Sequence, residues 1–281
     1  MPGHIPHEDT KVIGLGDQVV DQYVNKNVMY PGGNALNFAA FAKKLGYEAA
    51  FMGVFGDDRQ ARLVESSIDD LGIDRSHSVV RHGENGCAKV NIIDGDRVFI
   101  GSNEGGIAGQ EPLQLDEGDL DYLRGFGLIH MGVWGNANHL LPQVSRLGIP
   151  ISYDFSDEFD NAMVDAAIGY VQYGFFSVSG METNQVEVLL KHLFTEPNRA
   201  LIATRGSQST VVYDGQNFHE LAPHVVEAVD TMAAGDSFLT AFLLNHVVQG
   251  RGLDESLVAG QDFAAEAVQL NGSFGYGAPI R

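Results

Sequence analysis

The sequence contains a single cysteine, Cys87, among its 281 residues. One cysteine excludes an internal disulfide and favours a reducing compartment. No apolar run approaches the roughly 20 residues that a membrane-spanning helix needs. The first nine residues also lack the basic start and apolar stretch of a signal peptide. These absences predict a cytoplasmic protein with no membrane partner.

Basic residues are scarce as well. The chain has 17 Lys and Arg against 37 Asp and Glu, which gives a formal net charge of −20. No Lys/Arg cluster is present, and like charges repel, so a nucleic acid is not expected as a partner. A neutral or cationic small molecule remains compatible with an acidic surface, although net charge reports more on solubility than on specificity.

Four common functional signatures are missing. Gly14-x-Gly16 has Val19 where the dinucleotide fingerprint needs its third glycine, and Gly-Lys-Ser/Thr of a P-loop does not occur. The ten histidines form no HExxH or other close metal-ligand spacing, which argues against a zinc site. Gly-x-Ser-x-Gly, the commonest hydrolase elbow, is also absent.

Strand and helix patterns alternate along most of the chain, which is 44% hydrophobic and has 34 glycines. Such alternation predicts a mostly parallel sheet covered by helices on both faces. The expected strands are 11–16, 49–54, 128–131, 151–155, 200–204 and 209–213, the last turning through Asp214-Gly215 towards Phe218. The expected helices are 33–45, 59–71, 138–147, 235–248 and 253–270.

One segment interrupts this alternation. Residues 88–100 read as two strands joined across Asp94-Gly95, with alternating polar and apolar positions. A hairpin without a helix of its own suits a small lid over an active site. The other interpretation is an edge hairpin of the main sheet. An exposed lid edge would also invite pairing with a second copy of the chain, so we expect a homodimer built through the lids.

The strongest motif is the run from Val229 to Phe238, Val-Asp-Thr-Met-Ala-Ala-Gly-Asp-Ser-Phe. The small residues Ala233, Ala234 and Gly235 let the backbone turn closely into a helix whose N–H groups form an anion site. Asp236, in the first turn, could accept a proton from an attacking hydroxyl. Its basicity would be weak there, which phosphoryl transfer tolerates. The alternative is that Asp236 only caps the helix.

A second motif, residues 32–39, places two glycines at a helix start with Asn34 and Asn37 three positions apart. Their amides can both donate to and accept from vicinal hydroxyls, as a sugar requires. Asp17 and Asp21 follow the first strand, at the sheet edge where α/β folds bind ligands. Each of these residues alone could be ordinary turn chemistry, but the set favours sugar recognition.

Together the two motifs, about 200 residues apart, resemble the two signatures of the ribokinase (PfkB-type) carbohydrate kinases, over roughly residues 11–275. The resemblance implies a single three-layer αβα kinase domain over 1–281 that uses ATP and Mg²⁺, with a β lid from about 17–31 and 86–103. Asp236 would be the base and the Ala233–Gly235 amides the anion hole. The implied substrate-binding residues are Asp17, Asp21, Gly33, Asn34, Asn37, Arg97 and Glu104, and the nucleotide-binding residues are Thr204, Gly206, Ser207, Thr231 and Asn271.

Other segments are similar to one branch, the fructoselysine 6-kinases. These are 16–23, 96–99, 130–135 and 154–157. The similarity implies an amine-linked fructose phosphorylated at its 6-hydroxyl. Asp17, Glu104 and Asp157 would favour its ammonium groups by charge, and Arg97 could meet a carboxylate or phosphate, or be an exposed turn cation beside Asp96.

One motif departs from the family. Many relatives have Asn-x-x-Glu where this chain has Ser179-Gly-Met-Glu182, so Glu182 is the implied Mg²⁺ residue, through water. These residues do not decide whether a monovalent cation binds. The open alternatives in function are a kinase for fructose or ribose, a nucleoside kinase, and a sugar or nucleotide sensor without catalysis.

Overall fold

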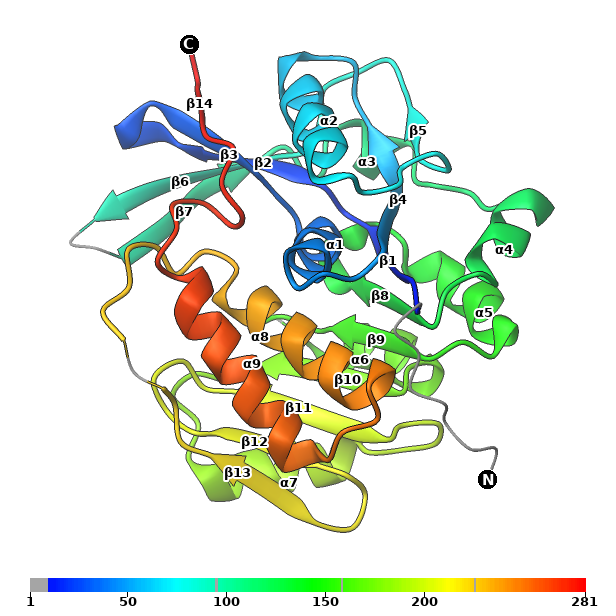
Figure 1. The fold of residues 1–281 in the computed structure, drawn as a ribbon, viewed down its shortest axis with the longest axis vertical. Helices are drawn as coiled ribbons and strands as arrows, with labels where there is room; N and C mark the ends of the chain where they lie inside the picture. The colour runs from blue at the N-terminus through cyan, green and yellow to red at the C-terminus, as the bar shows by residue number, and fades with distance from the viewer. Residues whose placement is uncertain (1–9, 94–95, 158, 225) are drawn as a thin grey trace.

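The computed structural model describes residues 10–93, 96–157, 159–224 and 226–281. Its centre is a nine-stranded sheet in the order β13-β12-β11-β10-β9-β8-β1-β4-β5 (Figure 1). All neighbours from β11 to β5 are parallel, while β12 pairs antiparallel with both β11 and β13. The strands are β1 Val12–Gly16, β4 Ala49–Phe55, β5 Val79–Val80, β8 Leu128–Gly132, β9 Ile151–Asp154, β10 Tyr173–Ser177, β11 Ala200–Thr204, β12 Thr210–Tyr213 and β13 Phe218–Leu221.

Helices cover both faces of this sheet, and successive strand residues alternate between two hydrophobic clusters. Val12 of β1, for example, packs in one cluster and Ile13 in the other. On the first face lie α1 Asn34–Lys44, α2 Arg59–Leu71, α8 Ala234–Leu243 and α9 Leu253–Ala267. On the second lie α3 Ile107–Gln110, α4 Glu117–Leu123, α5 Leu141–Val144, α6 Asn161–Ala167 and α7 Thr183–Leu193. The three-layer α/β fold class is confirmed.

A second sheet stands beside the upper edge of the first in Figure 1, with β6 and β7 projecting to the left. Its order is β14-β3-β2-β6-β7. The strands are β2 Val19–Tyr23, β3 Val28–Gly32, β6 Cys87–Ile93, β7 Asp96–Ser102 and β14 Ala278–Pro279. The hairpin expected at 88–100 is therefore β6 and β7 of this smaller sheet, not an edge of the main one. The Asp94-Gly95 turn lies outside the described residues, and so does the side chain of Arg97.

Most expected elements agree with the structure to within a residue or two. The helix α2 spans the expected residues: Asp58 accepts from the Ala61 amide at its start, at 2.8 Å, and Gly72 ends it at φ 67°. The expected helix 138–147 is instead three short pieces, η3 Asn138–Leu140, α5 and η4 Ser145–Leu147. Pro142 lies in the first turn of α5. Proline has no backbone N–H and is tolerated in a helix only in that turn, so one continuous helix over 138–147 cannot form.

Two further differences lie near the C-terminus. The helix expected over 235–248 is α8 followed by one π-helical turn, Leu244–Val248. The short strand β14 is the other difference, since the sequence patterns did not single it out. Earlier in the chain, those patterns also did not single out strand β10 and helix α7. Within the described ranges no helix is long and apolar enough to cross a membrane.

Candidate active site

The two sequence motifs meet in space because α1 and α8 pack against each other on the same face of the sheet. Each begins at the edge where the parallel strands end, and their N-termini face the last residues of β1, β8 and β9. This is the edge at which α/β folds bind ligands. The candidate site is therefore built from segments up to 200 residues apart in sequence.

Asp236 is held by the two asparagines of the first motif. Its Oδ1 accepts from Asn34 Nδ2 at 2.7 Å, and its Oδ2 accepts from Asn37 Nδ2 at 2.6 Å. Hydrogen bonds to a carboxylate are stronger than neutral ones and fix its orientation. The helix-capping alternative is not supported, because α8 has no side-chain cap and its N-cap residue is Ala233.

A second carboxylate, Asp154 at the end of β9, shares the same donor. Its Oδ2 accepts from Asn34 Nδ2 at 2.9 Å. Burial and the neighbouring Asp236 raise the pKa of Asp154 to about 7, against an opposing hydrogen bond from the Ser156 amide. The sequence reasoning assigned Asp154 no role. Its place at the end of a predicted central strand was the signal that could have found it.

Asp17 takes a different position from the one expected of a sugar contact. Its carboxylate accepts from the amides of Asn34, at 2.7 Å, and Ala35, at 3.1 Å. Burial raises its pKa, and these backbone hydrogen bonds oppose the rise. In this structure Asp17 fixes the first turn of α1, so its predicted contact with substrate remains a prediction.

The entry to α1 needs glycine. Gly33 has φ 109°, and a Cβ on it would lie 2.8 Å from Gln18 Cα and 2.9 Å from the Asp17 carbonyl oxygen. Such a contact is closer than these atoms tolerate, so the backbone at Gly33 passes directly against the segment between β1 and β2. Gly33 thus brings the Asn34 and Asn37 amides to Asp236.

The start of α8 carries the three backbone N–H groups predicted to form the anion site. Ala233 adopts the left-handed conformation at φ 57°, and the Ala234 N–H donates to the Thr231 carbonyl at 3.2 Å. Within the described residues, no hydrogen bond occupies the N–H of Ala233 or Gly235. The tight turn from Thr231 thus uses one of the three expected donors. A Cβ on Gly235 would meet no atom within 4 Å, so open space faces this helix end.

Asp21 lies on the second sheet and is only 6% exposed. A Cβ on Gly32 would come within 2.4 Å of its Oδ2 and 3.5 Å of Ser273 Oγ. The buried Ser273 Oγ and Asn37 Oδ1 have no hydrogen-bond partner among the described residues. Two acceptors and a carboxylate are thus placed where a polyhydroxyl ligand could use them.

The late segment lies beside the second motif. Asp230 Oδ2 accepts from the Gly272 amide at 2.9 Å and from the hydroxyl of Tyr23, on β2, at 2.7 Å. Asn271 precedes Gly272 and is exposed. Asn271 and Thr231 are the exposed neighbours of Gly272 and Asp230, so this hydrogen bond brings them close together at the surface. Their predicted role in binding nucleotide requires such proximity.

The remaining residues predicted to bind nucleotide are Thr204, at the end of β11, and Gly206 and Ser207, in the turn that follows it. Arg205, 5% exposed, anchors it by donating to the carbonyls of Ser209, at 2.7 Å, and Met181, at 3.3 Å. The Met181 contact brings the turn against the segment that precedes α7, where the Glu182 side chain is exposed.

Glu104 follows β7 and is exposed, with a positive φ of 54°. A Cβ on the next residue, Gly105, would lie 2.6 Å from Asn136 Nδ2, so this loop touches the loop after β8. Asn136, Ser156 and Ala233 also have positive φ. Strained non-glycine residues gather at functional sites. Three of these four follow β7, β8 and β9 in turn, and Ala233 directly precedes α8.

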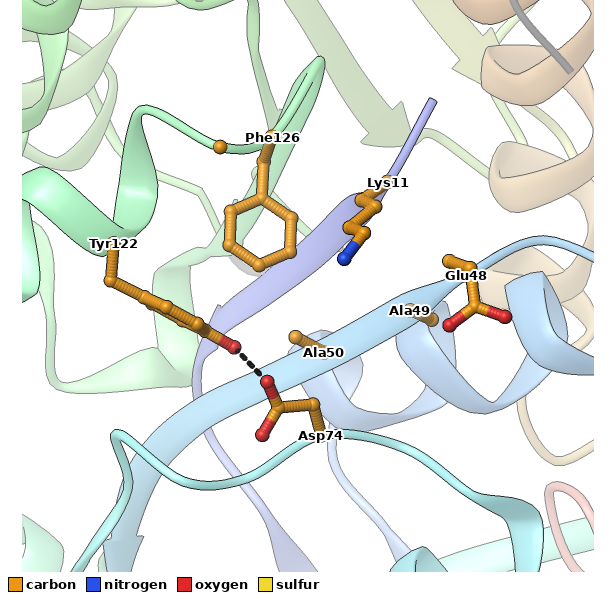
Figure 2. Close-up of a pocket in the computed structure, with 8 residues that line it drawn as sticks. Lys11, Glu48, Ala49, Ala50, Asp74, Tyr122 and Phe126 are labelled. Atoms are coloured by element: carbon orange, nitrogen blue, oxygen red, sulfur yellow. Dashed lines mark hydrogen bonds between the residues drawn. The ribbon is translucent and has the colours of Figure 1, made fainter. Parts of the chain in front are cut away.

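Two pockets lie away from this site. One, of about 210 Å³, is at the amino-terminal ends of β1 and β4, where the Tyr122 hydroxyl points to Asp74 (Figure 2). The other, of about 250 Å³, includes Gln22, Cys87 and Lys89 of the second sheet. None of the residues predicted for the site lines either pocket.

Two solved kinases have a similar fold. The ribokinase of Arabidopsis thaliana, solved with ribose and ATP, matches over 95% of each chain with a TM-score of 0.79 and 19% identity. The fructokinase of Xylella fastidiosa, solved with ATP, matches over 95% of each chain with a TM-score of 0.72 and 15% identity. The fold is thus that of the ribokinase-like α/β kinases.

The sequence comparisons define the family. The model described as pfkB family carbohydrate kinase matches residues 9–275. The fructosamine kinase FrlD of Bacillus subtilis is 34% identical over 272 residues, which cover 96% of this chain and 95% of that protein. The fructoselysine 6-kinase of Escherichia coli is 30% identical over 260 residues, covering 92% and 98%. The chain belongs to the pfkB family of carbohydrate kinases, as the two motifs predicted, and is a sugar kinase.

Proposed function

We propose that the chain transfers the γ-phosphoryl group of ATP to the 6-hydroxyl of fructoselysine or a related fructosamine. The observation that carries the phosphoryl-transfer step is Asp236, held by two amides beside the open N-terminus of α8. The amine-linked substrate is supported by the similarity to a fructosamine kinase and a fructoselysine 6-kinase. The carboxylates around the site would favour its ammonium groups.

In this mechanism Asp236 accepts the proton of the sugar hydroxyl. The hydroxyl oxygen then forms a bond to the γ-phosphorus, and the bond from that phosphorus to the bridging oxygen breaks, so that ADP leaves with the electron pair. The free N–H groups of Ala233 and Gly235 stabilise the charge that develops on the transferred group. The amides of Asn34 and Asn37 keep Asp236 oriented towards its proton.

Magnesium would be held mainly by the nucleotide. Among the described residues no group of three or more His, Cys, Asp or Glu could hold a metal ion, and the exposed Glu182 lies beside the turn after β11. This arrangement fits Mg²⁺, which keeps several waters and binds through one carboxylate and phosphate oxygens. Bound there, the ion would neutralise phosphate charge.

A panel assay tests the substrate. ADP release coupled to a chromogenic reaction is measured with fructoselysine, glucoselysine, fructose, ribose and adenosine. We expect turnover of fructoselysine to exceed that of the simple sugars. Turnover of fructose or ribose with none on the amine-linked sugars would overturn the substrate while keeping the kinase. Binding of ATP and sugar with no ADP release would make the protein a sensor.

The second sheet is proposed to act as a lid and as the contact of a homodimer. β7 is its outer strand, and on it Phe99 is 63% exposed, Ile100 49% and Val98 41%. An outer strand has unpaired backbone groups that can pair with another copy. A contiguous apolar strand on such an edge favours burial against an equivalent strand.

A further inference from the structure

His130, in β8, is fully buried and has no role in the mechanism above. Its ring packs on Phe38 of α1, with centroids 4.8 Å apart. Its Nε2 lies 2.9 Å from Asn34 Oδ1, and its Nδ1 lies 2.8 Å from Ser152 Oγ on the adjacent strand β9. The imidazole therefore touches the one side chain that both Asp154 and Asp236 share.

The direction of these hydrogen bonds follows from the carboxylates. Asn34 Nδ2 must face Asp154 and Asp236, since a carboxylate accepts and an amide oxygen there would be repelled. Asn34 Oδ1 then faces His130 and needs a donor, so Nε2 carries the proton. Burial lowers the pKa of His130 to about 3, which keeps the ring neutral. Nδ1 is thus an acceptor for the Ser152 hydroxyl.

The space around Asn34 Oδ1 is also closed. A Cβ on Gly132, the last residue of β8, would come within 2.4 Å of this oxygen. The amide is thus limited by Gly132 on one side and by His130 on the other. Its backbone is fixed as well, because the Asn34 N–H donates to Asp17 Oδ2. Every polar atom of the Asn34 side chain is engaged by protein groups.

We propose that His130 is a positioning residue for Asp236: through Asn34, the buried chain Ser152–His130–Asn34 sets the orientation of the carboxylate that accepts the sugar proton. The proposal rests on the proposed role of Asp236 as the base. Chains of hydrogen bonds strengthen each link, so the His130 donor makes the Asn34 N–H groups better partners for both carboxylates. It also gives Asn34 a role in orienting the base, in addition to its predicted contact with the sugar.

The first test compares two substitutions of similar size. His130→Gln can keep an N–H near the Nε2 position, whereas His130→Leu cannot donate. We expect His130→Leu to lower kcat about 10- to 100-fold, as for other partners that orient a reacting group. KM for sugar and for ATP should stay within about twofold, since the lost interaction acts on the base. His130→Gln should recover most of kcat. The proposal would be overturned if kcat fell equally in both variants and in proportion to the fraction of folded protein.

The second test does not depend on turnover. In protein labelled with ¹⁵N-histidine, two-bond correlations identify which ring nitrogen carries the proton. We expect His130 to remain neutral with its proton on Nε2 from pH 5 to 8, and Asn34→Ala to shift the Nε2 signal while Asp165→Asn does not. A proton on Nδ1, or a charged ring in this range, would overturn the proposal even if the protein proves to be a kinase for another sugar.

Discussion

Asp154 and Asp236 accept hydrogen bonds from one and the same nitrogen, Asn34 Nδ2, at 2.9 and 2.7 Å. Two carboxylates this close repel each other when both are ionised. The shared amide lowers that repulsion, and burial together with the neighbouring Asp236 raises the pKa of Asp154 to about 7. Asp154 therefore keeps its proton well above the pH at which an ordinary aspartate loses it.

Replacement of the base is the first prediction. Asp236→Asn should lower kcat by about 10²- to 10⁴-fold, because general-base contributions have this size. ATP and sugar dissociation constants, measured by calorimetry, should change little. A variant that keeps more than a tenth of wild-type kcat would contradict the assignment of Asp236 as base.

Asp154 should make stability depend on pH. The folded protein keeps its proton up to about pH 7, whereas the unfolded chain releases it near the ordinary pKa of 3.8. Between these values the folded state binds more protons, so the free energy of unfolding falls as pH rises. Asp154→Asn removes this loss, which the two pKa values put at about 4 kcal/mol, so the variant should be more stable than wild type at pH 8.

Urea unfolding at pH 4 and pH 8 measures this difference. At pH 4 the gain should be small, because wild-type Asp154 is then protonated in the folded state. Asp165→Asn, a change at an exposed carboxylate of α6, serves as the control. An equal gain in the free energy of unfolding at both pH values would show that the effect does not come from the raised pKa of Asp154.

Gly235 offers a test in which stability and activity move apart. Ala in a helix is more favourable than Gly by about 1 kcal/mol, and a Cβ on Gly235 meets no atom within 4 Å. Gly235→Ala should therefore keep or raise the unfolding midpoint. The methyl group would occupy the open space in front of the helix, so kcat/KM for ATP should fall at least tenfold.

The matched control is Gly169→Ala, where a Cβ also meets no atom within 4 Å. Gly169 lies in the 3-10 turn Ile168–Tyr170, which precedes β10 at the opposite edge of the sheet. It should leave kcat/KM unchanged. Wild-type activity in Gly235→Ala would mean that the phosphate does not approach this helix end.

The proposed dimer depends on the outer strand β7. Phe99→Glu places a charge on its most exposed apolar side chain, so we expect the sedimentation profile to change from dimer to monomer. Val188→Glu on α7, where the side chain is 70% exposed, is the control and should stay dimeric. A monomeric wild type at assay concentrations would rule out the lid dimer.

The sequence predicted the fold well because its signals are local. Glycine at position 72 and Asp58 are helix-end signals, and α2 begins and ends where they stand. The broken helix around Pro142 was predicted less well, because an apolar spacing cannot show where hydrogen bonds shift to a 3-10 pattern. Strand β14, of two residues, has no periodicity to detect.

The site was only partly predictable for a different reason. Asp236, Asn34 and Asn37 belong to sequence motifs and could be predicted from them. The contacts between them depend on how α1 and α8 pack, which the motifs do not show. His130 and Asp154 lie in buried strands. The sequence shows there only a polar residue among apolar ones, and it does not show which side chains are its partners. Likewise, the hydrogen bond from the Ala234 N–H to the Thr231 carbonyl depends on a turn that the sequence does not reveal.

Cys87 gives the molecule a built-in reporter. The one thiol of the chain lies in β6 of the second sheet, 6% exposed, and burial raises its pKa to about 11. Cys87 also lines the pocket of the second sheet, so a movement of that sheet would change the access of a thiol-reactive dye. The rate of labelling in unaltered protein, with and without sugar and nucleotide, would therefore test the proposed closing of the sheet.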